Sequence, residues 1–175
     1  MAVKKTNVQF KVKIPLGLPS IVREEIGERI IQDIKKRTSK GLDKDNKPFP
    51  KYTKEYKESA DFKAVGKTSR VNLKLSGDML DSLDILSNKD GVLTIGYEID
   101  DEVAGRVEGN VIGSYGQPTG SVSKARDFLG IKESKVELIV EEVKSELAPD
   151  IDKQSELLDV LAAELLTEIV GDEDG

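Results

Sequence analysis

Residues 37–56, RTSKGLDKDNKPFPKYTKEY, form the stretch from which the organisation of the whole chain can be worked out. The stretch contains the turn-forming residues Gly41 and Asn46, and it holds three of the chain's eight aromatic residues in a run rich in lysine. Aromatic rings bury a large apolar area. We therefore expect a basic loop anchored by three buried rings, those of Phe49, Tyr52 and Tyr56.

The segment before this loop predicts one strand and one long helix. Apolar and polar residues alternate from Val8 to Ile14, which is typical of a strand with one buried face. Ser20 is placed to cap a helix that runs to about Ser39, because apolar residues recur every four positions. They are Val22, Ile26, Ile30 and Ile34. Gly41 then supplies the helix stop.

Shorter elements are expected between the loop and residue 112. They are an exposed helix at 54–60, a mobile segment at 61–69, a strand at 71–75, a brief helix from Gly77-Asp78 that leads out through Ile85 and Leu86, a turn at 88–91, a strand at 92–99 and a helix capped by Asp100 or Asp101. Strands joined by short turns favour an antiparallel sheet. We expect an α+β fold, in which a mainly antiparallel sheet of about four strands packs against the long N-terminal helix.

The C-terminal part predicts a flexible loop and a pair of helices. The loop is GSYGQPTGSVS, residues 113–123, which we expect to become ordered at a subunit interface. Ser134 and Glu137 have the spacing of a capping box, and Pro149 ends the helix that follows. A second helix after Asp152 has an apolar face wider than one partner helix could cover, so it docks on the sheet or contacts another subunit. We expect an α+β domain at 1–131, a helical hairpin at 132–170 and a disordered acidic tail at 171–175.

Composition excludes several classes of protein. The chain has no histidine and no cysteine, which rules out disulfides, thiolate nucleophiles, imidazole catalysis and zinc sites built from those residues. No apolar run approaches the roughly 20 residues that cross a bilayer, and the N-terminus lacks the apolar segment of a secretory signal. We expect synthesis in the cytoplasm and no membrane partner.

Charge is divided unequally along the chain. Residues 1–75 contain 19 Lys+Arg against 9 Asp+Glu, a net charge of +10, whereas residues 76–175 contain 8 against 24, a net charge of −16. A subunit of this kind can place its basic part on the acidic part of a neighbour, which sets register and speeds encounter. The alternative is a solvated surface whose charges happen to segregate.

The sequence contains few of the residue patterns that enzymes use in catalysis. Close carboxylate pairs are inevitable among 33 Asp+Glu, and neither Ser-x-x-Lys nor Gly-x-Ser-x-Gly occurs. Asp43-Lys-Asp45 begins like a calcium loop, but Lys47 and Lys54 fall where the cation needs oxygen ligands. We expect no enzyme, no metal and no cofactor. A carboxylate-dependent hydrolase, the weakest alternative, would need two buried acids with shifted pKa in one cleft.

Nucleic-acid binding is the alternative from a different class. The lysines between Lys35 and Lys74 could contact phosphates, and the interleaved aromatic rings could stack on bases. The chain as a whole is acidic, which opposes such binding. In this alternative the chain would be a free cytoplasmic binding or regulatory protein.

Three blocks of sequence, taken in order, carry a resemblance to a known family. The first has Arg37-Thr38, Gly41, Asp43, Asp45, Lys47-Pro48-Phe49 and Tyr52. The second is LKLSGDMLDSL at 73–83, with Gly77 and Asp78, and the third is ARDFLG at 125–130, with Arg126, Phe128 and Gly130. This order resembles the tail-completion, or virion-morphogenesis, proteins of tailed bacteriophages over residues 21–131. Asn46 replaces the glycine usual there, a tolerable change because asparagine adopts left-handed backbone conformations. The helices after Ile131 have no counterpart in the family.

The resemblance implies a non-enzymatic subunit of the virion neck, the head–tail junction. Such a subunit assembles into a ring, with six copies the expected number, around the channel through which double-stranded DNA passes without sequence-specific binding. Its partners are further copies and the adjoining neck and tail-terminator rings, although the chain could itself be the tail terminator or the head-closure ring. The candidate subunit-interface residues are Tyr115, Gln117, Lys124, Leu157, Leu161 and Leu165.

Overall fold

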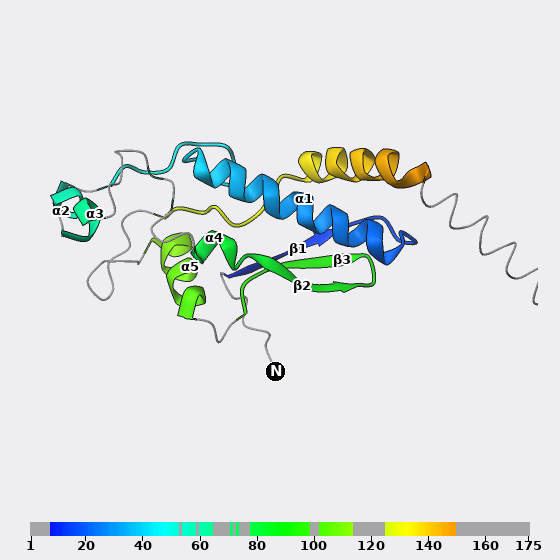
Figure 1. The fold of residues 1–175 in the computed structure, drawn as a ribbon, viewed down its shortest axis with the longest axis horizontal. Coiled ribbons are helices and arrows are strands. Elements are labelled where there is room, and N and C mark those ends of the chain that lie inside the picture. Colours follow the sequence, from blue (N-terminus) through cyan, green and yellow to red (C-terminus); the bar gives the residue numbers. More distant parts are fainter. Residues whose placement is uncertain are drawn as a thin grey trace, which may run out of the picture.

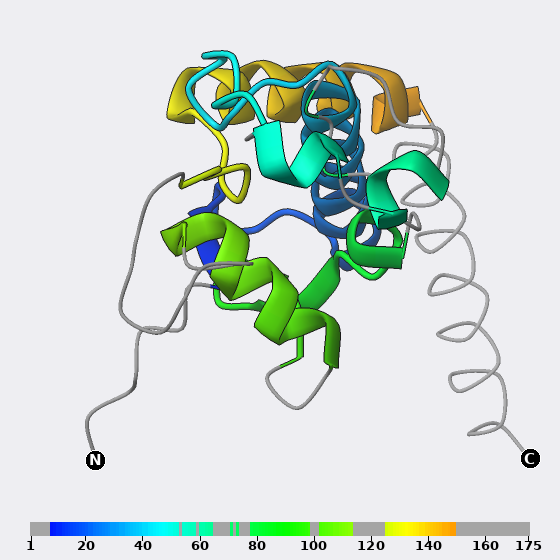
Figure 2. The same cartoon turned by 90° about the vertical axis from the view of Figure 1, so that its left-hand side faces the viewer.

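The computed structural model describes residues 8–52, 54–58, 60–64, 71, 73, 78–98, 102–113 and 125–149. Two long helices lie on one side of a small sheet: α1 (Ser20–Ser39) and a helix at residues 133–149 (Figures 1 and 2). The fold class is α+β, as the sequence predicts, with a small antiparallel sheet and a long N-terminal helix. No helix within the described ranges is both long enough and apolar enough to cross a membrane.

The sheet has three strands in the described part of the chain, not about four. β1 (Gln9–Lys13) and β2 (Asp84–Lys89) both pair antiparallel with the central strand β3 (Val92–Gly96). The β2–β3 hairpin closes through Asp90 and Gly91, whose φ angles of 51° and 70° suit a two-residue type I′ turn. Glycine and aspartate tolerate these angles, which explains the sharp turn at the expected place.

Two expectations about strands are wrong. Ile85 and Leu86 belong to β2 and do not simply lead out of the preceding helix; a register shift between Ile85 and Ser87 interrupts the pairing there. Val71 and Leu73, the described residues of the expected strand at 71–75, are not in a strand. Leu73 has a φ of 53°, which a strand does not allow.

Helix α1 covers the sheet with its isoleucine-rich face. Its buried apolar residues are Val22, Ile26, Ile30, Ile31 and Ile34. Gly27 allows close approach to the sheet, because a Cβ at this position would lie 3.0 Å from Ile85 Cγ1. The expected cap at Ser20 is wrong: Pro19 occupies the N-cap position, and Ser20 is the first helical residue, whose hydroxyl donates to Glu24.

Gly41 ends α1 as predicted. Its φ is 82°, its N–H donates to the Thr38 carbonyl, and the Leu42 N–H donates to the Arg37 carbonyl. This pair of hydrogen bonds is a Schellman motif, which satisfies carbonyls that the helix end would leave unpaired. The chain is thereby turned sharply into the basic loop.

The helix at 133–149 begins beside the C-terminal end of α1. The Lys132 carbonyl accepts the N–H of Val136, so Ser134 lies within the first turn and the predicted capping box is wrong. The apolar stripe is confirmed, because Val136, Val140 and Val143 are buried. Arg29 of α1 forms an ion pair with Glu146 near the other end of the helix. The two helices therefore share one hydrophobic core with the sheet.

Four short helices complete the described chain. They are α2 (Lys54–Glu58), α3 (Ala60–Ala64), α4 (Asp78–Asp81) and α5 (Glu102–Ile112). The expected mobile segment at 61–69 is wrong for residues 61–64, because α3 contains them and buries Phe62. The loop after Gly113, the second helix after Asp152 and the tail at 171–175 lie outside the described residues.

Candidate functional site

Arg37 lies at the centre of a buried junction between residues 37–52 and 125–131, called here the Arg37 junction. Its side chain is only 7% exposed. One guanidinium nitrogen, Nη2, donates to the carbonyls of Phe128 at 2.7 Å and Gly130 at 2.9 Å. Nη1 lies 3.6 Å from Asp33 Oδ2 one turn back on α1. Burial lowers the pKa of Arg37, and the neighbouring carboxylates, Asp33 first, oppose this effect.

The turn after α1 is held by a carboxylate. Asp43 Oδ1 accepts the N–H groups of Asp45 at 2.9 Å and Lys47 at 2.8 Å. Asn46 has a φ of 64°, a left-handed conformation that asparagine tolerates. The Phe49 N–H donates to the Gly41 carbonyl. One Asp43 oxygen thus stabilises the turn, and the bond to Gly41 fixes the backbone of Phe49, whose ring is buried.

Lys44 joins this turn to the third sequence block. Its Nζ lies 2.6 Å from Asp127 Oδ2, and its N–H donates to the Asp127 carbonyl at 2.9 Å. The hydrogen bond that Lys44 donates to the Asp127 carboxylate raises the pKa of Lys44. With Arg37, these contacts fix the two segments to each other at two places.

The aromatic anchors are confirmed where the structure describes them. Phe49 and Tyr52 are buried. The Tyr52 ring meets Phe62 edge to face with centroids 5.5 Å apart, and Arg126 Cζ lies 5.4 Å from the centre of the Tyr52 ring. Sequence reasoning missed Phe62, although an aromatic residue in a lysine-rich segment was a usable signal. The Tyr56 side chain lies outside what the structure describes.

The ARDFLG block also connects the junction to α5. The Arg126 N–H donates to the Asn110 carbonyl at 2.7 Å, and the Asn110 side chain donates to the Arg106 carbonyl. Phe128 is fully buried, and Gly130 has a φ of 136°, which glycine tolerates best. The block therefore serves to position backbone carbonyls for Arg37.

Other predicted site residues do not meet at this junction or cannot be placed. Asp78 begins α4, and its side chain lies outside what the structure describes. Gly77 and the interface candidates lie outside the described residues. Those candidates are Tyr115, Gln117, Lys124, Leu157, Leu161 and Leu165.

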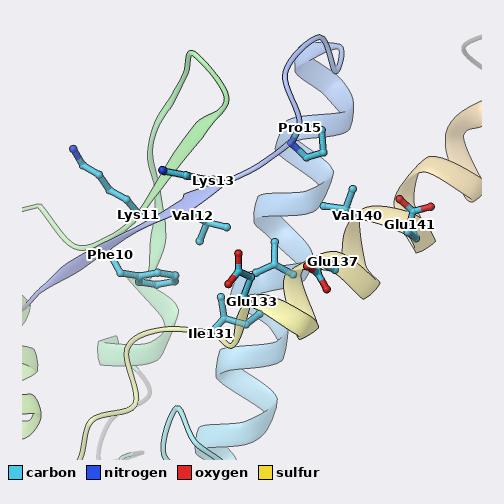
Figure 3. A pocket seen from close by; sticks show the side chains of 11 residues that line it. Phe10, Lys11, Val12, Lys13, Pro15, Ile131, Glu133, Glu137, Val140 and Glu141 are labelled. Atoms are coloured by element: carbon cyan, nitrogen blue, oxygen red, sulfur yellow. The ribbon is translucent and has the colours of Figure 1, made fainter.

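A separate groove of about 520 Å³, called here the β1 groove, runs between β1 and the 133–149 helix. Figure 3 shows Phe10 and Val12 directed towards the helix, Lys11 and Lys13 pointing away, and Glu133, Glu137 and Glu141 along the opposite wall. β1 is an edge strand. The Val8 carbonyl accepts the N–H of Tyr97 and the Ile14 N–H donates to the Gly91 carbonyl, at the two ends of β3. By the alternation of an antiparallel pair, the backbone N–H and C=O of Lys11 therefore point towards the free edge. An apolar groove beside an edge strand suits contact with another chain.

No family model, curated protein or solved structure matches this chain. In the Arg37 junction, Arg37, Asp43 and Lys44 are engaged with backbone groups or with neighbouring carboxylates. The β1 groove is lined by apolar side chains, lysines and glutamates. Both arrangements suit packing and contact between chains.

Proposed function

We propose that this chain is a structural, non-enzymatic subunit of a bacteriophage neck, assembled as a ring that joins capsid to tail around the DNA channel. The ring is made of copies of the chain, with six the expected number. It adjoins other rings of the head–tail junction, and double-stranded DNA passes through it without sequence-specific binding.

One observation carries the proposal. Arg37 of the first sequence block donates to the Phe128 and Gly130 carbonyls of the third, although about 90 residues separate them. Blocks matched only by chance would have no reason to meet in a buried contact. The second block also contributes to the same core, through Leu80 and Leu83. The family pattern thus describes parts that pack together in this fold.

The charge distribution supports a place around DNA. If the acidic C-terminal part faces the lumen, it repels the phosphate backbone and keeps the DNA free to slide, while the basic loop contacts an adjacent ring. A density map of the assembled neck provides the check. Lys51, Lys54 and Lys57 on the lumen wall would contradict this orientation.

The proposal is tested on virions whose genome encodes this chain. Antibodies against it should label the head–tail junction in electron micrographs, and the purified full-length protein should form rings in negative stain when the neighbouring neck protein is added. Binding to purified capsids or to purified tails then separates a neck or head-closure ring from a tail terminator. Unlabelled virions, together with a protein that stays monomeric beside its neighbour, would refute the proposal.

A further inference from the structure

A second cavity, of about 420 Å³, lies between the C-terminal end of α1, the turn at residues 42–46 and the start of the 133–149 helix. It is called here the basic pocket. Its lining has a single acidic residue, Asp33, among the charged side chains. The cationic lining residues are Lys36, Arg37, Lys40, Lys44, Lys132 and Lys135. Two segments far apart in the sequence, residues 33–46 and 131–138, thus supply one concentrated positive site.

Part of this charge is already used within the fold. Arg37 binds backbone carbonyls and lies near Asp33, and Lys44 pairs with Asp127. The remaining four lysines, at positions 36, 40, 132 and 135, form no ion pair with any described residue. The first turn of the 133–149 helix presents a partial positive charge and the C-terminal end of α1 a partial negative one, so the two helix ends offset each other. These four lysines therefore give the pocket its excess of positive potential, which favours an anionic partner.

The pocket is apolar as well as basic. Leu42, Ile131 and Leu138 contribute to its lining, and Leu138 is 58% exposed. A solvated basic face would not need a large exposed leucine in its wall. The combination favours a partner that alternates carboxylates with leucines, and it disfavours a simple inorganic anion or the regular phosphates of a duplex.

We propose that the basic pocket binds residues 150–175 of a second copy of this chain. These residues contain nine Asp+Glu against one Lys, a net charge of −8, and they carry leucines among the acids at 157, 158, 161, 165 and 166. Their charge and their apolar content both match the pocket. The β1 groove is a poorer match, because Glu133, Glu137 and Glu141 line its wall.

The geometry favours a second copy over the chain's own C-terminus. The 133–149 helix leads away from the pocket, and residue 149 lies about 21 Å beyond Lys135 at 1.5 Å per residue. A segment folding back along the pocket's face of this helix would run past the exposed Glu142, where like charges repel. The segment of another copy can reach the pocket from solvent without following this helix.

Such a contact joins two different surfaces, one from each copy. Repetition of a head-to-tail contact generates a closed ring when the rotation closes and an open filament when it does not. The inference thus rests on the proposed ring function for its biological meaning, and it names the surfaces that neighbours in the ring would share. The contact itself can be tested without assuming the ring.

Crosslinking of the full-length chain identifies the contact directly. Equal amounts of ¹⁴N-labelled and ¹⁵N-labelled protein are mixed, treated with a zero-length amine–carboxylate crosslinker and digested for mass spectrometry. Mixed-isotope crosslinks from Lys36, Lys40, Lys132 or Lys135 to acids between 150 and 174 are expected. Crosslinks confined to one isotope would show that the segment returns to its own pocket, and this result or an absence of such crosslinks overturns the proposal.

A charge-swap series supplies the energetic test. Full-length Lys132→Glu/Lys135→Glu should weaken self-association at least tenfold in sedimentation equilibrium, whereas Lys63→Glu/Lys89→Glu, with the same change in net charge at exposed sites elsewhere, should leave it unchanged. Asp150→Lys/Asp152→Lys/Glu156→Lys should restore association to the pocket variant. Circular dichroism checks that each variant is folded.

The outcomes also separate this inference from the proposed function. If rings still form when the charges of Lys132 and Lys135 are reversed, the ring proposal stands and the pocket contact is overturned. Mixed-isotope crosslinks without rings in virions would leave the contact standing and refute the neck assignment. A salt-sensitive gel shift of a 30-base-pair DNA duplex that requires Lys132 and Lys135, with no self-crosslinks, would assign the pocket to nucleic acid instead.

Discussion

Replacing Arg37 with methionine tests the Arg37 junction most directly. The change keeps a long side chain but removes the donor to two buried carbonyls, at 2.7 and 2.9 Å. Hydrogen bonds to charged groups contribute about 1.5–3 kcal/mol each, so the gross loss is about 3–6 kcal/mol. Methionine avoids the cost of burying a guanidinium, a cost visible in the lowered pKa of Arg37. We expect a net loss of about 3 kcal/mol in the free energy of unfolding.

Urea unfolding followed by far-UV circular dichroism measures this loss. With a slope of about 2 kcal/mol per M, a loss of about 3 kcal/mol lowers the midpoint by about 1.5 M urea. Arg29→Met is the matched control, because Arg29 is 29% exposed and its partner Glu146 is 56% exposed, so the midpoint should hardly move. If Arg37→Met unfolds at the same urea concentration as the wild type, the two carbonyls do not need this donor and Arg37 does not stabilise the junction.

Three further substitutions test other parts of the fold. Phe49→Ala should lower stability by about 3 kcal/mol, because the ring is buried, and an unchanged melting temperature would contradict its role as an anchor. Gly96→Ala should lower the free energy of unfolding by about 2 kcal/mol or more, because a Cβ would lie 2.6 Å from Gln9 Cα in the paired strand. In the control Gly105→Ala the new Cβ meets open space on a helix, so the free energy of unfolding should rise by up to about 1 kcal/mol. Equal shifts in melting temperature for the two variants would show that close packing at Gly96 does not matter. Burial raises the pKa of Tyr97, whose hydroxyl has no hydrogen-bond partner in the described part of the chain. Because the folded-state pKa exceeds the unfolded value of about 10, stability falls as pH rises above that value, and Tyr97→Phe should reduce this loss without lowering stability at pH 7.

Sequence periodicity predicted the long elements and missed some local details. The stripe of α1 recurs at four positions along the helix, and Gly41 supplies the backbone angle that its end requires, so the helix and its C-terminal limit follow from the sequence. The caps at Ser20 and Ser134 failed because each serine lies inside its helix, and the carbonyl of Pro19 or Lys132 accepts the first hydrogen bond. Three alternating residues at 71–75 were too few to predict a strand. Leucine as a residue type gives no sign of a positive φ, so the backbone angle of Leu73 could not be predicted from the sequence.

The Arg37 junction could be anticipated only in part. The resemblance named Arg37, Phe128 and Gly130 as important positions, but it gave no reason why. The acceptors are backbone carbonyls, which every residue carries, so residue identity does not reveal the pairing. Phe62 was missed for a related reason, because its burial depends on the position of the Tyr52 ring. Long-range contacts of this kind are decided by the fold as a whole.

The basic pocket is another long-range arrangement that only the fold reveals, and it bears on contact between copies. Lys132 and Lys135 belong to the acidic part of the sequence, yet the fold places them beside Lys36 and Lys40 at the end of α1. The charge division along the chain therefore understates how concentrated the positive site is. If each copy offers one pocket and one acidic segment, every open assembly leaves one of each unfilled, and only closure satisfies all of them. A closed ring should give a single discrete mass that persists on dilution, whereas an open chain of the same contacts should give a ladder of masses whose average falls with concentration.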